Sequence, residues 1–215
     1  MAFPLFIVSF NVLVFVLAVI YGHGQGDVFH YFQEGRLITF WSSFQLVAIA
    51  VYCWIIHERD RLRHSGPVWS SGSLIWALMA LGFLFLAFDE TLMIHENADF
   101  KIHEILDIPE TNLTDRLDDF IVLFYGLAGF YFMWRFRSGL TPYLAVARKL
   151  VVPGILIFLA MVAADVLTNR RDIILDENLH NMLSLLEEAT KIAAECLLLL
   201  GAYQSWKLSC SRSIT

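Results

Sequence analysis

Six apolar runs, each about as long as a bilayer is thick, constrain this chain more than any other feature. They cover residues 4–21, 37–56, 69–88, 117–134, 145–167 and 178–206 and alternate with polar segments. A helix needs about 20 apolar residues to cross the hydrocarbon core of a membrane. We therefore expect an all-α polytopic membrane protein in which residues 1–215 form a single domain. Its predicted architecture is a six-transmembrane-helix bundle, with one or two short helices between the third and fourth spans.

Composition supports a membrane protein and argues against some partners. Hydrophobic residues make up 58% of the chain and charged residues 17%, whereas soluble domains are about 45–50% apolar and about 25% charged. The net charge is −6, and no dense tract of lysine and arginine is present. Since binding to nucleic acid relies on such a positive patch, we expect no nucleic-acid partner.

The basic residues between the runs are divided unequally. With six spans both termini lie on one side of the membrane, and that side carries nine lysines and arginines against five on the other. The nine are Arg59, Arg61, Arg63, Arg135, Arg137, Arg148, Lys149, Lys207 and Arg212. Because basic loops stay in the cytoplasm, both termini are predicted to be cytoplasmic, in the cell (inner or plasma) membrane.

Acidic residues and histidines show the opposite bias. Apart from Glu58 and Asp60, and three glutamates inside the last run, all the acidic residues fall on the predicted outer side. Five of the seven histidines are on that side as well: His23, His30, His95, His103 and His180. Solubility alone requires no such gathering of imidazoles with carboxylates. This asymmetry predicts a functional site at the outer face of the bundle.

The first candidate element follows the third apolar run, in the segment 89–96 with the sequence Asp-Glu-Thr-Leu-Met-Ile-His-Glu. If the helix continues beyond the membrane surface, residues four and seven apart share one face. Imidazoles and carboxylates on one face are ligands suited to zinc, iron or manganese. The alternative is a solvated amphipathic helix on the membrane surface. The two predicted lines of side chains are Asp89, Glu96 and His103, and His95, Asp99 and His103.

The second candidate element is a charged stripe on the last apolar run. Glu177 and His180 have the E-x-x-H spacing with which bundle proteins offer two metal ligands from one helix. Charged groups inside a span are costly, so they need partners or a metal ion. The alternative is a structural salt-bridge cluster in which Lys191 neutralises a glutamate. The stripe consists of Glu177, His180, Ser184, Glu187, Glu188, Lys191 and Glu195.

The string Phe-Leu-Ala-Phe-Asp-Glu-Thr-Leu-Met-Ile-His-Glu, residues 85–96, resembles a motif of uncharacterised bacterial multi-pass membrane proteins, in which an apolar span ends in Asp-Glu and is followed by His-Glu. The resemblance implies that Asp89, Glu90, His95 and Glu96 act as a unit, and it implies no particular activity. Two metalloenzyme families are not matched. Membrane zinc hydrolases such as the alkaline ceramidases close with H-x-x-x-H, and di-iron bundles need a second E-x-x-H.

We therefore hypothesise that one or two divalent metal ions (Zn or Fe/Mn) bind at the outer face. The metal would activate water or oxygen for a hydrolase or oxidase that acts on a lipophilic substrate among the membrane lipids. Asp89 or Asp119 would act as general base. Carboxylates at the outer ends of the third, fourth and fifth spans would complete the site. The predicted metal ligands are Glu90, His95, Glu96, Asp165, His180 and Glu187.

Two other function classes are consistent with the same residues. A transporter or proton relay would use the stripe from Glu187 to Glu195 as an ion path partway across the membrane. An accessory subunit of a larger membrane complex would use the polar cluster only to stabilise its fold, beside partner membrane subunits. Separately, Gly82, Gly126 and Gly129 predict close approaches between helices, because small residues are typical of membrane helix contacts.

Overall fold

A computed structural model describes residues 2–28, 30–32, 35–63, 72–107, 109, 117–168 and 177–212. Within these ranges it leaves the side chains at positions 119, 163–168, 177, 178 and 180 undescribed. All secondary structure in the described residues is helical, which confirms the all-α prediction. The long helices are α1 (Ala2–Gly24), α2 (Leu37–Leu62), α3 (Leu74–Leu92), α5 (Leu117–Arg135), α7 (Val152–Thr168) and α8 (Glu177–Ser211).

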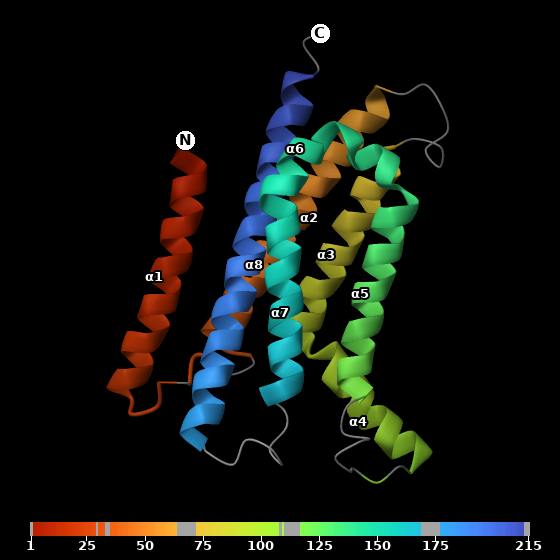
Figure 1. Cartoon of the computed structure of the whole chain (residues 1–215). Helices are drawn as coiled ribbons and strands as arrows, with labels where there is room; N and C mark the ends of the chain where they lie inside the picture. Colours follow the sequence, from red (N-terminus) through yellow and green to blue (C-terminus); the bar gives the residue numbers. More distant parts are fainter. Residues whose placement is uncertain are drawn as a thin grey trace.

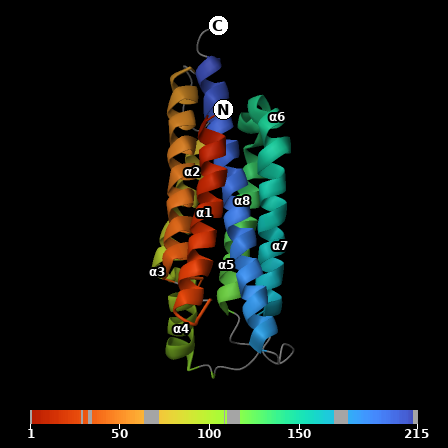
Figure 2. The same ribbon diagram turned by 90° about the vertical axis from the view of Figure 1, so that its left-hand side faces the viewer.

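The helices lie side by side and run in alternating directions along the chain (Figures 1 and 2). A short helix, α4 (Ile94–Leu106), lies obliquely below α3 and α5. At the top of Figure 1, α5 is joined to α7 by the 3-10 helix η2 (Arg137–Tyr143), by α6 (Leu144–Val146) and by the π-helical turn η3 (Ala147–Val151). We call the end with α4 the acidic end, because it carries Asp89 and Glu90, and the opposite end, with Arg63 and Arg135, the basic end. Both chain termini lie at the basic end.

Four helical segments in the described residues are long and apolar enough to cross a membrane: Ala2–Gly24, Leu37–Leu62, Leu74–Leu92 and Arg137–Val162. A shorter apolar helix covers Phe120–Arg135. Many large apolar side chains on α1 and α5 are exposed, among them Phe6, Phe124 and Leu127. So much exposed apolar surface is typical of helices that face lipid, so these helices indicate a membrane protein.

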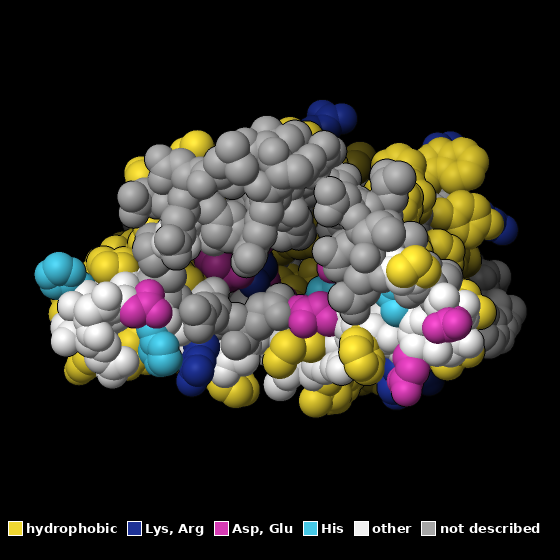
Figure 3. Space-filling model, turned by 90° about the horizontal axis from the view of Figure 1, so that it is seen from below, with side chains coloured by type: hydrophobic (Ala, Val, Ile, Leu, Met, Phe, Trp, Pro, Cys, Tyr) yellow, Lys and Arg dark blue, Asp and Glu magenta, His cyan; other side chains and the backbone are white. Residues whose placement is uncertain are grey.

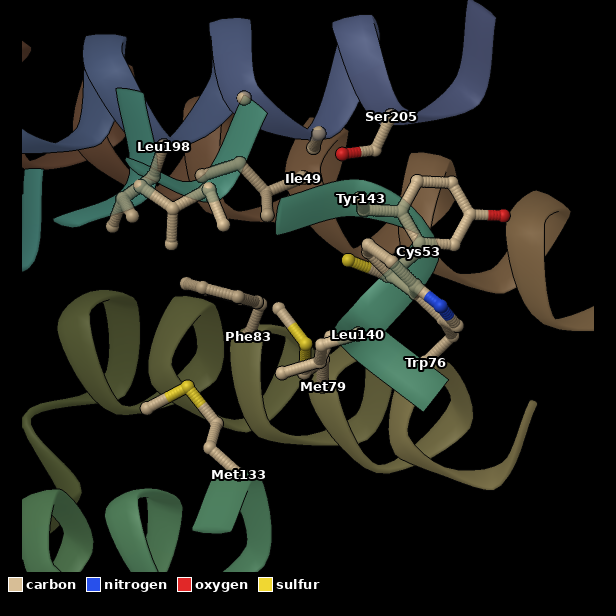
Figure 4. A pocket seen from close by; sticks show the side chains of 14 residues that line it. Ile49, Cys53, Trp76, Met79, Phe83, Met133, Leu140, Tyr143, Leu198 and Ser205 are labelled. Carbon is tan, nitrogen blue, oxygen red and sulfur yellow. The ribbon is translucent and has the colours of Figure 1, made fainter. Parts of the chain in front are cut away.

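The main apolar core lies between α2, α3 and α8, toward the basic end. Ile49, Cys53, Ile75 and Leu199 are at most 1% exposed there. This core borders a cavity of about 50 Å³, lined by aliphatic, aromatic and sulfur-containing side chains and by Ser205 (Figure 4). Such a space has room for about one or two water molecules, since each takes about 30 Å³ in the liquid. The cavity is therefore a packing void, and the polar chemistry of the chain lies elsewhere.

Close helix approaches occur at glycines other than the predicted ones. A Cβ atom added to Gly82, Gly126 or Gly129 would meet nothing within 4 Å, so the prediction for these three residues is wrong. A Cβ on Gly201 of α8 would instead lie 2.8 Å from Cγ2 of Val151. Near the middle of the bundle, a Cβ on Gly154 of α7 would lie 3.2 Å from the carbonyl oxygen of Ala194. Small residues thus bring the segment 151–154 against α8.

The third helix does not continue unbroken into the segment 94–106, because it ends at Met93 and a short helix follows, as predicted between the third and fourth spans. This residue adopts the left-handed conformation, with φ 50° and ψ 49°, and separates α3 from α4. The Asn97 side chain donates to the carbonyl oxygens of Leu92 and Met93, at 2.9 and 2.8 Å. The bond to Leu92 satisfies a carbonyl oxygen at the end of α3, where acceptors lack helical partners, while the Met93 carbonyl also accepts the backbone N–H of Asn97 at 2.9 Å. Both bonds stabilise the break.

Candidate functional site: a buried ion cluster at the acidic end

Asp89 and His95 form a pair across the break between α3 and α4. Oδ2 of Asp89 lies 2.9 Å from Nδ1 of His95, and Oδ1 accepts the backbone N–H of the same residue at 3.0 Å. The second bond caps the first turn of α4, where backbone donors have no helical partners. Asp89 is only 5% exposed. The tight break at Met93 thus brings a buried carboxylate against an imidazole and fixes the direction of its ring.

Lys191 of α8 lies between two carboxylates from different helices. Its Nζ atom is 2.8 Å from Oε1 of Glu188, one turn earlier on α8, and 2.8 Å from Oε1 of Glu90 on α3. All three side chains are mostly buried. Unpaired charges at this depth would be strongly destabilising, and the arrangement satisfies the ammonium group by two charge-assisted hydrogen bonds. The contact also ties α3 to α8.

Glu195 lies one turn further into the bundle and is only 3% exposed. Its carboxyl group is bound by α2, because Ser42 Oγ donates to Oε1 at 2.6 Å and Gln45 Nε2 donates to Oε2 at 3.3 Å. Lys191 and Glu195 are four residues apart, so they share a face of α8 at a rise of about 6 Å. Glu90 and Glu188 thus contact the ammonium group of Lys191, and Glu195 lies one turn further along the same face of α8. We call these four side chains the ion cluster.

The polar network continues from α2 to α1. Oε1 of Gln45 accepts from Asn11 Nδ2 at 3.2 Å, and the Asn11 amide also donates to the carbonyl oxygen of Ile7 at 2.9 Å. Oδ1 of Asn11 accepts the indole N–H of Trp41 at 2.9 Å. Buried amides are costly unless bonded in this way, so the network fixes how α1 and α2 meet around Glu195.

A second His–carboxylate pair lies on α4, where Nδ1 of His103 is 3.0 Å from Oδ1 of Asp99. This pair confirms one step of the predicted line of side chains. Nε2 of His103 is buried and has no hydrogen-bond partner among the described residues. Figure 3 views the acidic end from below and shows acidic side chains, histidines and a basic side chain between residues drawn in grey.

The structure places the predicted metal ligands in different pairs. Glu90 contacts Lys191, while His95 contacts Asp89 and lies 3.8 Å from Glu96 (Nε2 to Oε1). Glu187 is partly exposed, and its backbone carbonyl accepts from Thr190 Oγ1. In the described part of the chain no three His, Cys, Asp or Glu side chains are arranged to hold a metal ion. The side chains of Asp119, Asp165 and His180 lie outside the described residues, so a ligand set that includes them stays a prediction.

The sequence interpretation missed the polar residues of α1 and α2. Asn11, Ser42 and Gln45 sit inside apolar runs, where each polar side chain needs a buried partner. Ser42 and Gln45 are three residues apart and so share one helix face. That spacing was the available signal, although it does not say which helix they face. The predicted contact of Lys191 with Glu188 is present, and Glu90 is a partner from outside α8.

No curated protein and no solved structure shows significant similarity to the chain. One family does match, and it covers residues 4–206, which include α2 to α7 entire and nearly all of α1 and α8. The match thus includes every residue of the ion cluster and its network. The chain belongs to the family described as Domain of unknown function (DUF8692).

Proposed function

We propose that the chain crosses the cell membrane six times, with α8 as the sixth span and the basic end in the cytoplasm. The alternating helix directions and the common position of the two termini support an even number of crossings (Figure 1). The excess of basic residues at the basic end supports the orientation. The acidic end, with the ion cluster, then faces the outside. Although α8 is less apolar than the other spans, its charged face is directed toward neighbouring helices rather than lipid.

Within this topology, we propose that the ion cluster binds a proton or a monovalent cation. The protein would couple the movement of this cation across the membrane to transport. The observation that carries the proposal is that, among the described residues, three carboxyl groups (Glu90, Glu188 and Glu195) lie on or near the ammonium group of Lys191. Fully ionised, these four side chains would together carry two more negative than positive charges in a largely buried place. Uptake of a cation reduces this excess, so the cluster is a binding site for positive charge.

The position of the cluster suggests from which side the cation enters. Glu188 to Glu195 spans about 10 Å of α8, measured from the acidic end inward. Beyond Glu195, the apolar core around Ile49, Cys53 and Leu199 separates the cluster from the basic end. A cation therefore enters from the acidic end, and its release on the other side requires a second conformation. The π-helical turn η3 offers a place for such a change, since these turns are frequent at functional sites.

Liposomes reconstituted with the purified protein test this function. An enclosed pH-sensitive dye reports proton entry under an imposed membrane potential, with either Na⁺ or a large organic cation outside. We expect Glu195→Gln and Glu188→Gln to abolish the cation-dependent signal. Glu104→Gln is the matched control, because Glu104 is exposed on α4 at the same end. Wild-type liposomes that acidify, or take up ²²Na⁺, no faster than empty ones would overturn the proposal.

The metal-dependent enzyme remains a second candidate because of the Asp89–His95 pair. Histidines that bind metal ions usually donate their other ring N–H to a carboxylate, which orients the ring. Asp89 contacts Nδ1 of His95 in this manner, which supports an orienting role for Asp89 in this candidate; Asp89 or Asp119 as general base stays a prediction. Nε2 of His95 would then bind the metal with Glu96, and with Asp165, His180 and Glu187 as further predicted ligands. Zinc would suit a hydrolase, and iron or manganese an oxidase.

Elemental analysis of protein purified without chelators tests this second function. We expect about one or two bound metal ions per chain, reduced by His95→Ala and by His180→Ala. His23→Ala is the control, because His23 is exposed at the end of α1 and belongs to no described pair. A folded protein that contains no metal, and whose stability is unchanged on addition of zinc, iron or manganese, would exclude this candidate.

A further inference from the structure

A second polar site lies at the basic end, far from the ion cluster. It is a cleft of about 370 Å³, open on one side, formed where α2 ends, α3 begins and η2 crosses between them. This volume is within the usual range of small-ligand sites, about 300–1,000 Å³. Its lining consists of Asp60, Arg63, Gly72, Ser73, Ser138, Gly139, Pro142 and Arg212. Two arginines against one aspartate give the lining a net positive charge.

The aspartate in the cleft is engaged by its neighbours. The Tyr143 hydroxyl donates to Oδ2 of Asp60 at 2.8 Å, and Nη1 of Arg63 lies 2.9 Å from Oδ1. Nη2 of Arg63 donates to the carbonyl oxygen of Ser209, at the end of α8. The guanidinium group of Arg212 lies 5.8 Å from the centre of the Tyr143 ring. These contacts hold Arg63 at the wall of the cleft and compensate the charge of Asp60, while Arg212 lies beside the Tyr143 ring.

The backbone of the cleft is arranged for close approach. A Cβ atom on Gly139 would lie only 1.8 Å from the carbonyl oxygen of Gly72, so glycine is required where η2 crosses the start of α3. The side chain of Ser73, the residue before α3, makes no capping hydrogen bond to the helix.

We infer that this cleft binds a phosphate group, either that of an anionic phospholipid or that of a free phosphate compound. Guanidinium groups bind phosphate oxygens by paired hydrogen bonds. Arg63 and Arg212 both line the cleft, together with Ser73 and Ser138. In the proposed topology the cleft opens at the cytoplasmic surface, where anionic headgroups are concentrated. The site and its ligand are distinct from the cation binding proposed for the acidic end, so the two proposals stand or fall separately.

The test measures binding of two probes to the full chain. The first probe is inorganic phosphate, titrated against the protein in neutral detergent and followed by its effect on thermal unfolding. The second is phosphatidylglycerol in phosphatidylcholine nanodiscs, quantified as lipid retained per chain by native mass spectrometry. We expect saturable binding of at least one probe, weakened by Arg212→Gln about tenfold or more, since hydrogen bonds to charged groups contribute about 1.5–3 kcal/mol.

Control variants separate the cleft from the general charge of the basic end. Arg137→Gln and Lys207→Gln remove exposed basic residues at the same end that do not line the cleft, and they should leave binding unchanged. Arg63→Lys keeps the charge but loses the paired hydrogen bonds, so it should weaken binding while the chain stays folded. Phosphate binding without lipid binding identifies a soluble ligand, and the reverse identifies a headgroup. Binding of neither probe, or equal losses in the control variants, would overturn the inference.

Discussion

Helices α5 and α8 cross the same bundle, yet their side chains meet opposite surroundings. None of the described side chains of α5 is buried, and its exposed residues include Phe120, Phe124 and Leu127. In α8, by contrast, Glu195 and Leu199 are almost completely enclosed. The more apolar helix is the peripheral one, and the charged helix is central. In a membrane bundle, polar residues therefore mark the helix that faces other helices, because lipid cannot satisfy them.

The largest loss in the free energy of unfolding should follow from removing the ammonium group of Lys191 on α8. Lys191→Met leaves Glu90 and Glu188 without their common partner, and breaking a buried ion pair from one side costs about 3–5 kcal/mol. An unfolding titration in mixed micelles measures the loss. Adding Glu90→Gln to the same chain should recover part of it. A double variant as unstable as the single one would mean that Lys191 acts through packing and not charge.

We expect an intermediate effect on the free energy of unfolding when a buried apolar residue of α8 and an exposed one of α5 are each shortened to alanine. Leu199→Ala opens a space in the core of α8, where such truncations cost about 2–5 kcal/mol. Leu127→Ala on α5 removes a side chain that is 59% exposed, so its free energy of unfolding should change by much less. The same titration compares them. Equal losses would show that α5 is packed against another chain or a tightly held lipid.

The smallest and most specific contrast uses two glycines. Gly201→Ala puts a methyl group 2.8 Å from Val151 Cγ2, and overpacking of this kind costs about 1–3 kcal/mol. Gly129→Ala on α5 meets nothing within 4 Å and should stabilise the helix by up to about 1 kcal/mol through helix propensity. Thermal unfolding of the two variants should thus shift in opposite directions. Two shifts of the same sign would contradict the close contact at Gly201.

The sequence predicts the helices well because the length and periodicity of apolar runs are local properties. The runs at 4–21, 37–56 and 117–134 agree with α1, α2 and α5 to within a few residues, apart from the end of α2, which extends six residues further. The run at 145–167 is less regular than predicted, since residues 147–151 form a π-helical turn before α7 begins. Spacing along α8 also indicates the Lys191–Glu188 pair, because three residues make nearly one turn.

The rest of the site depends on information that one helix does not contain. Ser42 and Glu195 are 153 residues apart in the chain, and their contact depends on how α2 and α8 are rotated toward each other. The break at Met93 could not be predicted from the sequence either. Residues in the left-handed conformation are usually glycine or asparagine, and this one is a methionine. It sends His95 back to Asp89 and away from the straight line of side chains that an unbroken helix predicts.

The break at Met93 has a mechanical consequence. Both oxygens of one carboxylate on α3 hold the first turn of α4, and with the Asn97 side chain they tie this thirteen-residue helix to the end of α3. Protonating that carboxylate, or drawing the imidazole toward another ligand, would remove one of the two side-chain ties between the helices.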